Sequence, residues 1–325
     1  MAWSDTKKAK KRRQKKMLKA IFGKSLPIVM AVVVIIGILF GYLYENVEPV
    51  RLFVDDIVVI FNPDAVRPFI DPEGDEMAVH FIDVGQGDSA LLQTPKGSVL
   101  IDCGEKEYGD DVVNYLKSCG VTELEYFIVT HPDSDHMGSA EYVLKNVKVK
   151  NFVINAKEKS TTIFENMLDA AEDAGLETYI ADAGDKFTVG ALQLSILSPR
   201  AEDISKLESN DSSLVILATY GERSFLFTGD AENEGEELLL KYSGNNLRCD
   251  VFSAGHHGSK TSNSLELLQA ARPEFVVISC GKDNKYGHPD PEALESFAAV
   301  GATVYRTDEL GTVIFVTDGV ELTKK

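Results

Sequence analysis

The chain has 325 residues, enough for one large domain or two small ones, and its hydrophobic (44%) and charged (26%) fractions are those of an ordinary globular protein. Its charge is less ordinary, because 51 acidic residues stand against 33 Lys and Arg, a formal net charge of −18. Ten of the basic residues and one acid lie in residues 1–24, so 23 basic and 50 acidic residues remain, a net charge of about −27. Such a body repels a nucleic-acid backbone, which excludes broad electrostatic binding but not attraction of a phosphate to a local metal cluster.

An uncharged apolar segment, residues 25–44, follows the basic tail 1–24. Its 20 residues, at about 1.5 Å each, would span the roughly 30 Å core of a bilayer as a helix. The positive-inside rule places the tail in the cytoplasm and the rest of the chain outside. The sequence therefore predicts a single-pass cell-membrane protein with an extracellular body. A cleaved signal peptide is the alternative, but no A-x-A-like site follows the segment.

Residues 45–76 contain four prolines and end in an acidic run, which predicts a stalk before a globular domain at 77–325. Hairpins followed by strands that alternate with helices favour an α/β sandwich for that domain. We expect the last two strands to pair with each other. Strands are expected at 77–84, 89–94, 98–102, 125–130, 151–155, 191–198, 212–220, 223–229, 249–255, 275–281, 302–307 and 311–319, and helices at 109–118, 138–146, 161–174, 232–242, 262–271 and 291–299.

Four side chains that can bind a metal follow the strand at 125–130 within six residues. They are His131, Asp133, Asp135 and His136 of the segment HPDSDH. Imidazole and carboxylate are ligands for Zn, Mn or Fe, and loops at strand ends are where open catalytic sites collect. Asp133 could cap the next helix, but capping does not require two histidines. The segment therefore predicts a metal site.

Three further strand ends carry residues of the same kind. Asp230 ends the strand at 223–229, where alone it would be read as a helix cap and beside the first motif as a bridging ligand. His256 and His257 follow the strand at 249–255, and His288 follows the strand at 275–281. Five of the six histidines thus fall in three strand-end loops, which favours one common site. The sixth, His80, lies inside a predicted strand and is interpreted as structural.

Two early carboxylates are open to two interpretations. Asp88, in the loop DVGQGDS, and Asp102, at the end of the strand 98–102, either orient metal ligands from the second shell or simply form turns. The cysteines show no metal-binding spacing and are expected to be buried thiols, although export would permit one disulfide. They are Cys103, Cys119, Cys249 and Cys280.

Taken together, these motifs resemble the metallo-β-lactamase superfamily and, more narrowly, the hydrolase domain of the ComEC family of DNA-uptake channels. The resemblance covers residues 77 to the end, without the multi-span channel of that family. It implies an αβ/βα four-layer sandwich and two divalent metal ions, Mn or Zn. The matching segments are DVGQGDS, THPDSDH, NDSSLVI, FLFTGD, HHGSKTS and YGHPDPE.

The resemblance also implies a ligand map. His131 and Asp133 would bind the first metal, Asp135 and His136 the second, and Asp230 both. The replacement of a family histidine by Asp133 makes the first site harder and favours Mn, with Zn as the other option.

The remaining ligands stay open between alternatives. The superfamily's histidine before the bridging aspartate is missing, and Asp211 stands near its place as the candidate ligand of the first metal. If the order of histidines in phosphodiesterase members such as RNase Z applies to this chain, His256 or His257 is catalytic and His288 is the last metal ligand. In the β-lactamases a single late histidine ligates, which would favour His256.

The implied function is metal-assisted hydrolysis by a membrane-anchored enzyme, with phosphodiesters in DNA or in the cell envelope as the favoured substrates. A second hypothesis is an ester, lactone or lactam hydrolase, since fold does not fix substrate. A third is a non-catalytic surface protein that holds metal. Besides the membrane and a phosphodiester substrate, the sequence indicates no partner.

Overall fold

The computed structural model describes residues 74–244 and 247–325. The predicted basic tail, the predicted membrane helix at 25–44 and nearly all of the predicted stalk lie outside these residues. Within the described part of the chain, no helix has both the length and the apolarity needed to cross a bilayer.

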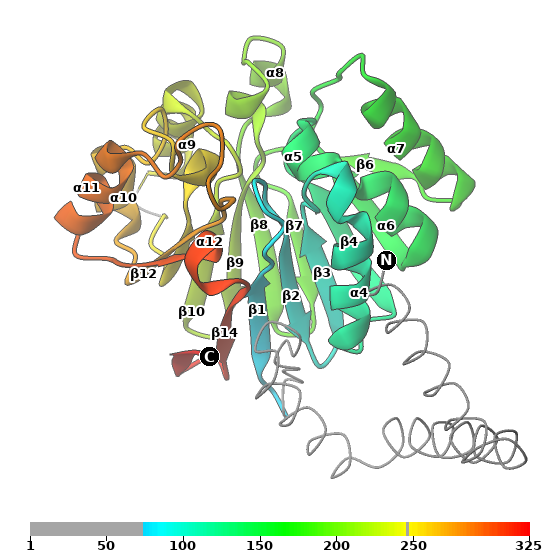
Figure 1. Ribbon diagram of the computed structural model, residues 1–325, viewed down its shortest axis with the longest axis horizontal. Coiled ribbons are helices and arrows are strands. Elements are labelled where there is room, and N and C mark those ends of the chain that lie inside the picture. Colours follow the sequence, from blue (N-terminus) through cyan, green and yellow to red (C-terminus); the bar gives the residue numbers. More distant parts are fainter. Residues whose placement is uncertain (1–73, 245–246) are drawn as a thin grey trace, which may run out of the picture. The chain divides into compact units, whose positions relative to one another are not determined.

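The first of two sheets has eight strands in the order β15-β14-β1-β2-β3-β4-β5-β6 (Figure 1). The strands from β15 to β3 run antiparallel, and those from β3 to β6 run parallel. Every residue of β1 and β2 is buried, as expected for strands covered on both faces. The bounds are Met77–Phe81 (β1), Ala90–Thr94 (β2), Gly97–Ile101 (β3), Glu123–Val129 (β4), Lys148–Ile154 (β5), Thr178–Ile180 (β6), Val313–Thr317 (β14) and Leu322–Lys324 (β15).

The second sheet has seven strands in the order β13-β12-β11-β10-β9-β8-β7. Its strands from β10 to β13 run parallel, and those from β7 to β10 run antiparallel. The bounds are Lys186–Val189 (β7), Leu192–Ser198 (β8), Val215–Tyr220 (β9), Arg223–Phe227 (β10), Val251–Ser253 (β11), Phe275–Ile278 (β12) and Thr303–Arg306 (β13).

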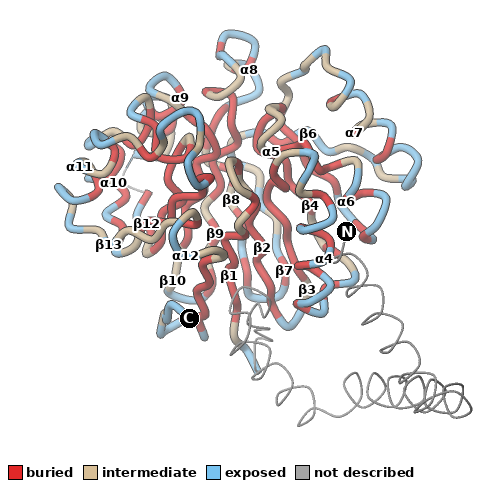
Figure 2. The backbone as a smooth tube through the Cα atoms, viewed as in Figure 1, coloured by how far each residue is buried: buried red, intermediate tan, exposed pale blue. Residues whose placement is uncertain are grey.

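Helices cover the outer face of each sheet, so the described domain has four layers, helix–sheet–sheet–helix (Figures 1 and 2). The first sheet packs on α4 (Gly109–Ser118), α6 (Ala140–Asn146) and α7 (Thr162–Asp173). The second packs on α9 (Asn233–Ser243), α10 (Leu265–Ala271) and α11 (Pro291–Ala299). The short helices are η1 (Lys106–Tyr108), α5 (Ser134–Met137), α8 (Ala201–Ile204), η2 (Asn210–Ser212), η3 (Gly255–Gly258) and α12 (Thr307–Leu310).

A core of buried apolar side chains lies between the two sheets. Phe81 of the first sheet stacks on Phe227 of the second, with ring centroids 5.7 Å apart. Phe315 meets Phe225 edge-on from the opposite sheet, at 6.4 Å. These contacts hold the sheets face to face, so that loops of both sheets meet at one edge of the sandwich.

Most of the expected elements are present, and one pairing was wrong. The strands expected at 302–307 and 311–319 do not pair, because β13 joins β12 in the second sheet and β14 joins β1 in the first. The turn of α12 separates them and carries the chain from one sheet to the other. Adjacent apolar runs suggested a hairpin, and only the tertiary fold reveals the crossover.

Two structural predictions are confirmed. His80 is buried in β1 and its Nδ1 lies 2.8 Å from the Tyr115 hydroxyl, so it belongs to the packing of α4 on the first sheet. All four cysteines are buried thiols.

Candidate metal centre

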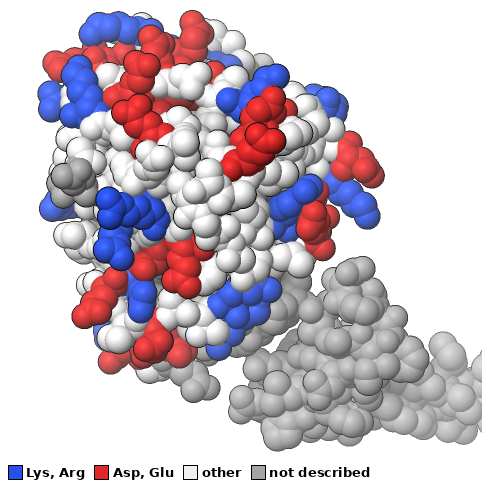
Figure 3. Space-filling model, turned by 90° about the vertical axis from the view of Figure 1, so that its left-hand side faces the viewer, with Lys and Arg blue, Asp and Glu red and all other residues white. Residues whose placement is uncertain are grey.

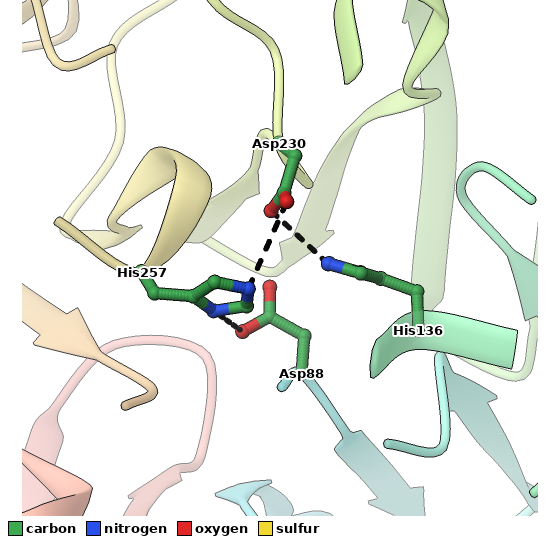
Figure 4. Close-up of side chains that lie close together, drawn as sticks. All are labelled: Asp88, His136, Asp230 and His257. Carbon is green, nitrogen blue, oxygen red and sulfur yellow. Dashed lines mark ion pairs between the residues drawn. The ribbon is translucent and has the colours of Figure 1, made fainter. Parts of the chain in front are cut away.

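The candidate site is built from loops of both sheets. Side chains from four separate segments point toward one another in Figure 4, and their ligand atoms all lie within 4.8 Å of each other. Two segments follow β1 and β4 of the first sheet, and two follow β10 and β11 of the second. The four residues are Asp88, His136, Asp230 and His257.

His136 is oriented by a buried carboxylate. Its Nδ1 lies 2.9 Å from Asp102 Oδ2, and Asp102 also accepts hydrogen bonds from the Thr130 N–H (2.8 Å) and hydroxyl (2.7 Å). Because the carboxylate accepts, Nδ1 carries the donated proton, and Nε2 faces Asp230 Oδ1 at 3.1 Å. This is the way a carboxylate orients a histidine that ligates a metal, which matches the second-shell interpretation of Asp102.

The same threonine orients His131. Since the Thr130 hydroxyl donates to Asp102, its oxygen is left to accept from His131 Nδ1, 3.2 Å away. The other nitrogen of His131, Nε2, lies 3.9 Å from Asp230 Oδ2 and 4.0 Å from Asp133 Oδ1. Burial lowers the pKa of His131 to about 4, so the imidazole is neutral near pH 7, as a metal ligand must be.

A backbone carbonyl orients the third imidazole, His257. Its Nδ1 lies 3.0 Å from the Ser279 oxygen, which can only accept, so the proton sits on Nδ1. Its Nε2 lies 3.2 Å from Asp135 Oδ2 and 3.7 Å from Asp230 Oδ2. All three histidines therefore direct Nε2 toward the same group of carboxylates.

Four buried atoms at this centre make no hydrogen bond, although His136 Nε2 faces Asp230 Oδ1 at 3.1 Å and Asp88 Oδ1 lies 3.4 Å from His257 Nδ1. A buried polar atom without a hydrogen bond costs about 1–3 kcal/mol, so the four together favour a bound ligand. Imidazole nitrogens and carboxylate oxygens are the donors that Zn and Mn take, and the residues present therefore fit a divalent metal. The four atoms are His131 Nε2, His136 Nε2, Asp88 Oδ1 and Asp230 Oδ1.

The two aspartates of the HPDSDH segment are in different surroundings. Asp133 Oδ1 accepts from Lys159 Nζ at 2.7 Å and from the Ser209 hydroxyl. Burial raises the pKa of Asp133, but His131, Lys159 and Ser209 outweigh it and hold the pKa below its usual value. Asp135 instead faces His257. A cation beside His131 and Asp133 would therefore share Asp133 with a lysine.

Asp211 is not among the clustered residues. Its Oδ1 accepts the backbone N–H groups of Glu232 (3.0 Å) and Gly235 (2.8 Å), at the start of α9. These amides would otherwise lack a partner in the first turn of the helix, so helix capping accounts for this carboxylate without a metal. Its neighbour Asn210, rather than Asp211, lines the pocket in front of the cluster.

Asp88, expected either to orient a metal ligand or to form a turn, lies in the cluster itself. Its backbone N–H donates to the Asp135 oxygen at 3.1 Å, so the two metal-competent loops are joined through their backbones. A Cβ on Gly87 would lie 2.4 Å from that same oxygen, which explains why a glycine precedes Asp88. The paired glycines of the DVGQGDS loop were the available signal in the sequence.

His256 and His257 both adopt a left-handed backbone, with φ values of 48° and 54°. Each such residue costs about 1–3 kcal/mol, and strain of this kind collects at functional sites. The result is that His257 points inward, 1% exposed, and His256 faces the pocket, 23% exposed. His256 Nδ1 lies 2.9 Å from Glu232 Oε1, and its Nε2 lies 3.8 Å from Asp230 Oδ2.

Nothing in the sequence marked Glu232 as a site residue, because an acid at the start of a helix is explained by the helix itself. In the structure it accepts from the Thr261 hydroxyl (3.1 Å) and the Asn210 amide (3.3 Å) besides facing His256. These contacts fix the carboxylate, which in turn orients the imidazole toward the pocket.

His288 lies at the pocket beside the cluster. Its ring centroid is 5.4 Å from that of His256 and 6.5 Å from that of His257, and its Nε2 is 4.0 Å from Asp290 Oδ2. It is not one of the four residues whose ligand atoms converge. The geometry therefore favours His257 over His288 as the late histidine ligand.

A pocket of about 170 Å³ opens onto the cluster. Its wall is polar and combines the predicted ligands with residues that the motifs did not single out. The lining residues are Gln86, Glu105, Asp133, Ser134, Asp135, Asn210, Asp230, His256, His257, Tyr286 and His288.

Relatives of the chain are found among competence proteins. It is 37% identical over 266 residues to ComE operon protein 3 of Bacillus subtilis and 32% identical over 258 residues to competence protein ComA of Neisseria gonorrhoeae. The matches cover 76% and 79% of this chain, but only 34% of each relative, so the chain spans about a third of their length.

Among solved structures, the metallo-beta-lactamase fold protein YhfI from Bacillus subtilis aligns with a TM-score of 0.49 at 12% identity, over 75% of this chain and all of YhfI. The family model described as the metallo-beta-lactamase superfamily matches residues 82–282. That span includes the loops that bear Asp88, His136, Asp230 and His257. The chain belongs to the metallo-beta-lactamase superfamily.

Proposed function

We propose that the chain is a phosphodiesterase that depends on divalent metal ions. The observation that carries the proposal is the convergence on Asp230 of the Nε2 atoms of the three fully buried histidines, His131, His136 and His257, each held through its Nδ1 by an acceptor. An imidazole so held presents its lone pair to a metal without reorganisation.

The ligands divide into two groups around Asp230. Asp88, His136 and His257, with Asp135 beside them, would hold one ion. His131 and Asp133 would hold the second. Bound divalent ions supply an activated water and a positive field for the charge that develops on the scissile group. With carboxylates in both groups, the mixed donor set suits Mn as well as Zn.

His256 is the proton donor in this proposal. It reaches the pocket with Nε2, and the Glu232 carboxylate at 2.9 Å from Nδ1 holds a proton on that nitrogen. A histidine so oriented can protonate the leaving oxygen of a phosphodiester, a step that contributes about 10²- to 10⁴-fold in rate. His288 stands next to His256 and would contact a phosphoryl oxygen.

Nucleic acid is the substrate class that the relatives favour. Their names connect them with competence, and the resemblance of the motifs is to the hydrolase domain of DNA-uptake channels. The matched region spans about a third of those proteins' length, so the substrate and the activity are proposed for this domain by itself. A phosphodiester of the cell envelope is the alternative substrate.

We also propose that residues 25–44 anchor the enzyme in the cell membrane with the catalytic domain outside. The support is the 20-residue uncharged segment and the preceding ten basic residues. A reporter fused at Lys325 should be exposed to an external protease in intact cells. A reporter that stays protected until the cells are lysed would reverse the topology.

The first experiment measures hydrolysis of methyl p-nitrophenyl phosphate by the purified full-length chain, freed of metal and then supplied with Mn or Zn. Turnover that appears with metal and disappears with chelator supports a phosphodiesterase. His256→Gln should lose turnover and retain the metal content of the wild type. A folded, metal-loaded protein that hydrolyses a lactone or lactam but no phosphodiester would refute the proposal.

A further inference from the structure

We propose that Tyr286 is a stacking platform for a nucleobase next to the scissile phosphodiester, so that the substrate is single-stranded nucleic acid. This inference rests on the proposed phosphodiester chemistry and adds to it the part of the substrate that is recognised. It assigns a role to an exposed aromatic side chain that the metal centre does not use.

Tyr286 combines exposure with a position at the pocket. It is 56% exposed, more than any other large apolar or aromatic side chain of the described residues. It also lines the pocket together with Asp230 and His256, whereas other exposed side chains such as Tyr179 do not. An aromatic ring in water at the mouth of a polar site is a surface on which a planar ligand can stack.

The backbone around Tyr286 is fixed rather than loose. Asn284 Oδ1 accepts the N–H groups of Tyr286 (3.1 Å) and His288 (3.0 Å). The Asn284 amide donates to the oxygens of Gly281 (2.9 Å) and His288 (2.6 Å), which closes the loop on itself. A backbone held this way loses little conformational entropy when the ring it carries binds a ligand.

The ring of Tyr286 is also joined to the metal centre. It stacks on His288, with centroids 5.7 Å apart and an interplanar angle of 24°. His288 in turn lies 6.5 Å from the ring of His257, one of the clustered residues. A base on Tyr286 would therefore continue a row of rings that leads to the cluster.

A lysine accompanies the ring. Lys285 Nζ lies 4.8 Å from the Tyr286 centroid. An exposed cation–π pair is worth roughly a factor of two to five in an equilibrium constant, less than stacking on a base. A base can therefore displace the ammonium group, which then remains beside the phosphate of the same nucleotide.

Single strands fit these features better than duplexes. In a duplex the base faces are covered by their neighbours, so Tyr286 could reach one only after the base is unstacked. The chain also carries a net charge of −18, and acidic and basic side chains are interspersed on the one face that Figure 3 shows, without a continuous basic stripe. Binding either a duplex or a single strand through its phosphates alone would need such a stripe, so an exposed base has to supply part of the recognition.

The test compares two fluorescent strands of equal length, oligothymidylate and its abasic analogue, with full-length wild type, Tyr286→Ala and Tyr286→Phe. Fluorescence anisotropy in the presence of the metal gives the dissociation constants. Hydrolysis rates are measured on the same strands. Tyr286→Ala should weaken binding of oligothymidylate about 5- to 100-fold and leave the abasic strand unchanged. Tyr286→Phe should bind like the wild type, and Tyr179→Ala, which removes an exposed tyrosine away from the pocket, should have no effect.

The outcomes separate the inference from the proposed function. Equal effects of Tyr286→Ala on both strands, or none, would overturn the stacking platform, and so would tighter binding of duplex than of single strand. Hydrolysis of the abasic strand by the wild type reports on the phosphodiesterase without any base. If that hydrolysis is absent while base-dependent binding persists, the proposed function fails and the platform stands.

Discussion

Asp102 controls which nitrogen of His136 can reach a metal, and Asp102→Asn tests this directly. Asp102 has a positive φ of 56°, a conformation that asparagine tolerates well, so the substitution adds little backbone strain. It replaces Oδ2, which now accepts from His136 Nδ1, with an amide that donates. The imidazole must then accept at Nδ1 and carry its proton on Nε2, the atom that faces Asp230.

The expected magnitude follows from that change of tautomer. Loss of an outer-shell partner of a histidine ligand weakens metal affinity about 10- to 100-fold, or about 1.4–2.8 kcal/mol. The Thr130 hydroxyl also loses its charged acceptor, and hydrogen bonds to charged groups are worth about 1.5–3 kcal/mol. The metal-free variant should therefore be less stable by a similar amount.

Competition with a chromophoric chelator measures the metal affinity, and thermal unfolding of the metal-free protein measures the stability. The matched control is Asp111→Asn, which makes the same charge change at an exposed position of α4. It should alter neither quantity. A folded Asp102→Asn protein with wild-type metal affinity would refute the proposed orientation of His136.

Three other outcomes are expected. His256→Gln should lower kcat about 10²- to 10⁴-fold with unchanged metal content by elemental analysis; parallel loss of metal would instead make His256 a ligand. Burial lowers the pKa of His136, but neighbouring carboxylates outweigh burial and raise the pKa well above its usual value. The metal-free centre therefore holds protons at pH 7, which a metal must displace. Metal binding should weaken as the pH falls, and calorimetry should detect the released protons. Gly87→Ala should cost about 1–3 kcal/mol of unfolding free energy beyond Gly175→Ala, because a Cβ at Gly87 would meet a backbone oxygen and a Cβ at Gly175 would meet nothing within 4 Å. Equal melting temperatures of the two variants would contradict this.

Much of the fold could be predicted from local patterns. The expected helix at 109–118 is α4, and the expected strands at 98–102 and 125–130 overlap β3 and β4, which begin one and two residues earlier. Three strands, β6, β7 and β15, were not expected from the sequence, and all three lie at sheet edges and are largely exposed. A hydrophobic pattern in the sequence arises from burial, so a strand that is only half buried has no such pattern to recognise.

The ligand map was less predictable than the elements. The HPDSDH segment could be recognised as a candidate metal site because it has two histidines and two acids in six residues. Asp88 and Asp211 were each assigned from their place in a motif, yet Asp88 joins the cluster and Asp211 caps α9. A carboxylate can bind a metal, cap a helix or orient a histidine, and its sequence neighbours do not distinguish these uses.

By itself, the sequence determined the residue types that gather at the strand ends and the chemistry they can support, because a metal needs imidazole and carboxylate whatever the fold around them. The tertiary structure decided which of them meet. The Glu232–His256 pair, the Ser279 carbonyl that orients His257 and the platform at Tyr286 all depend on contacts between distant segments. Those contacts arise only when two sheets pack face to face and bring their loops to one edge.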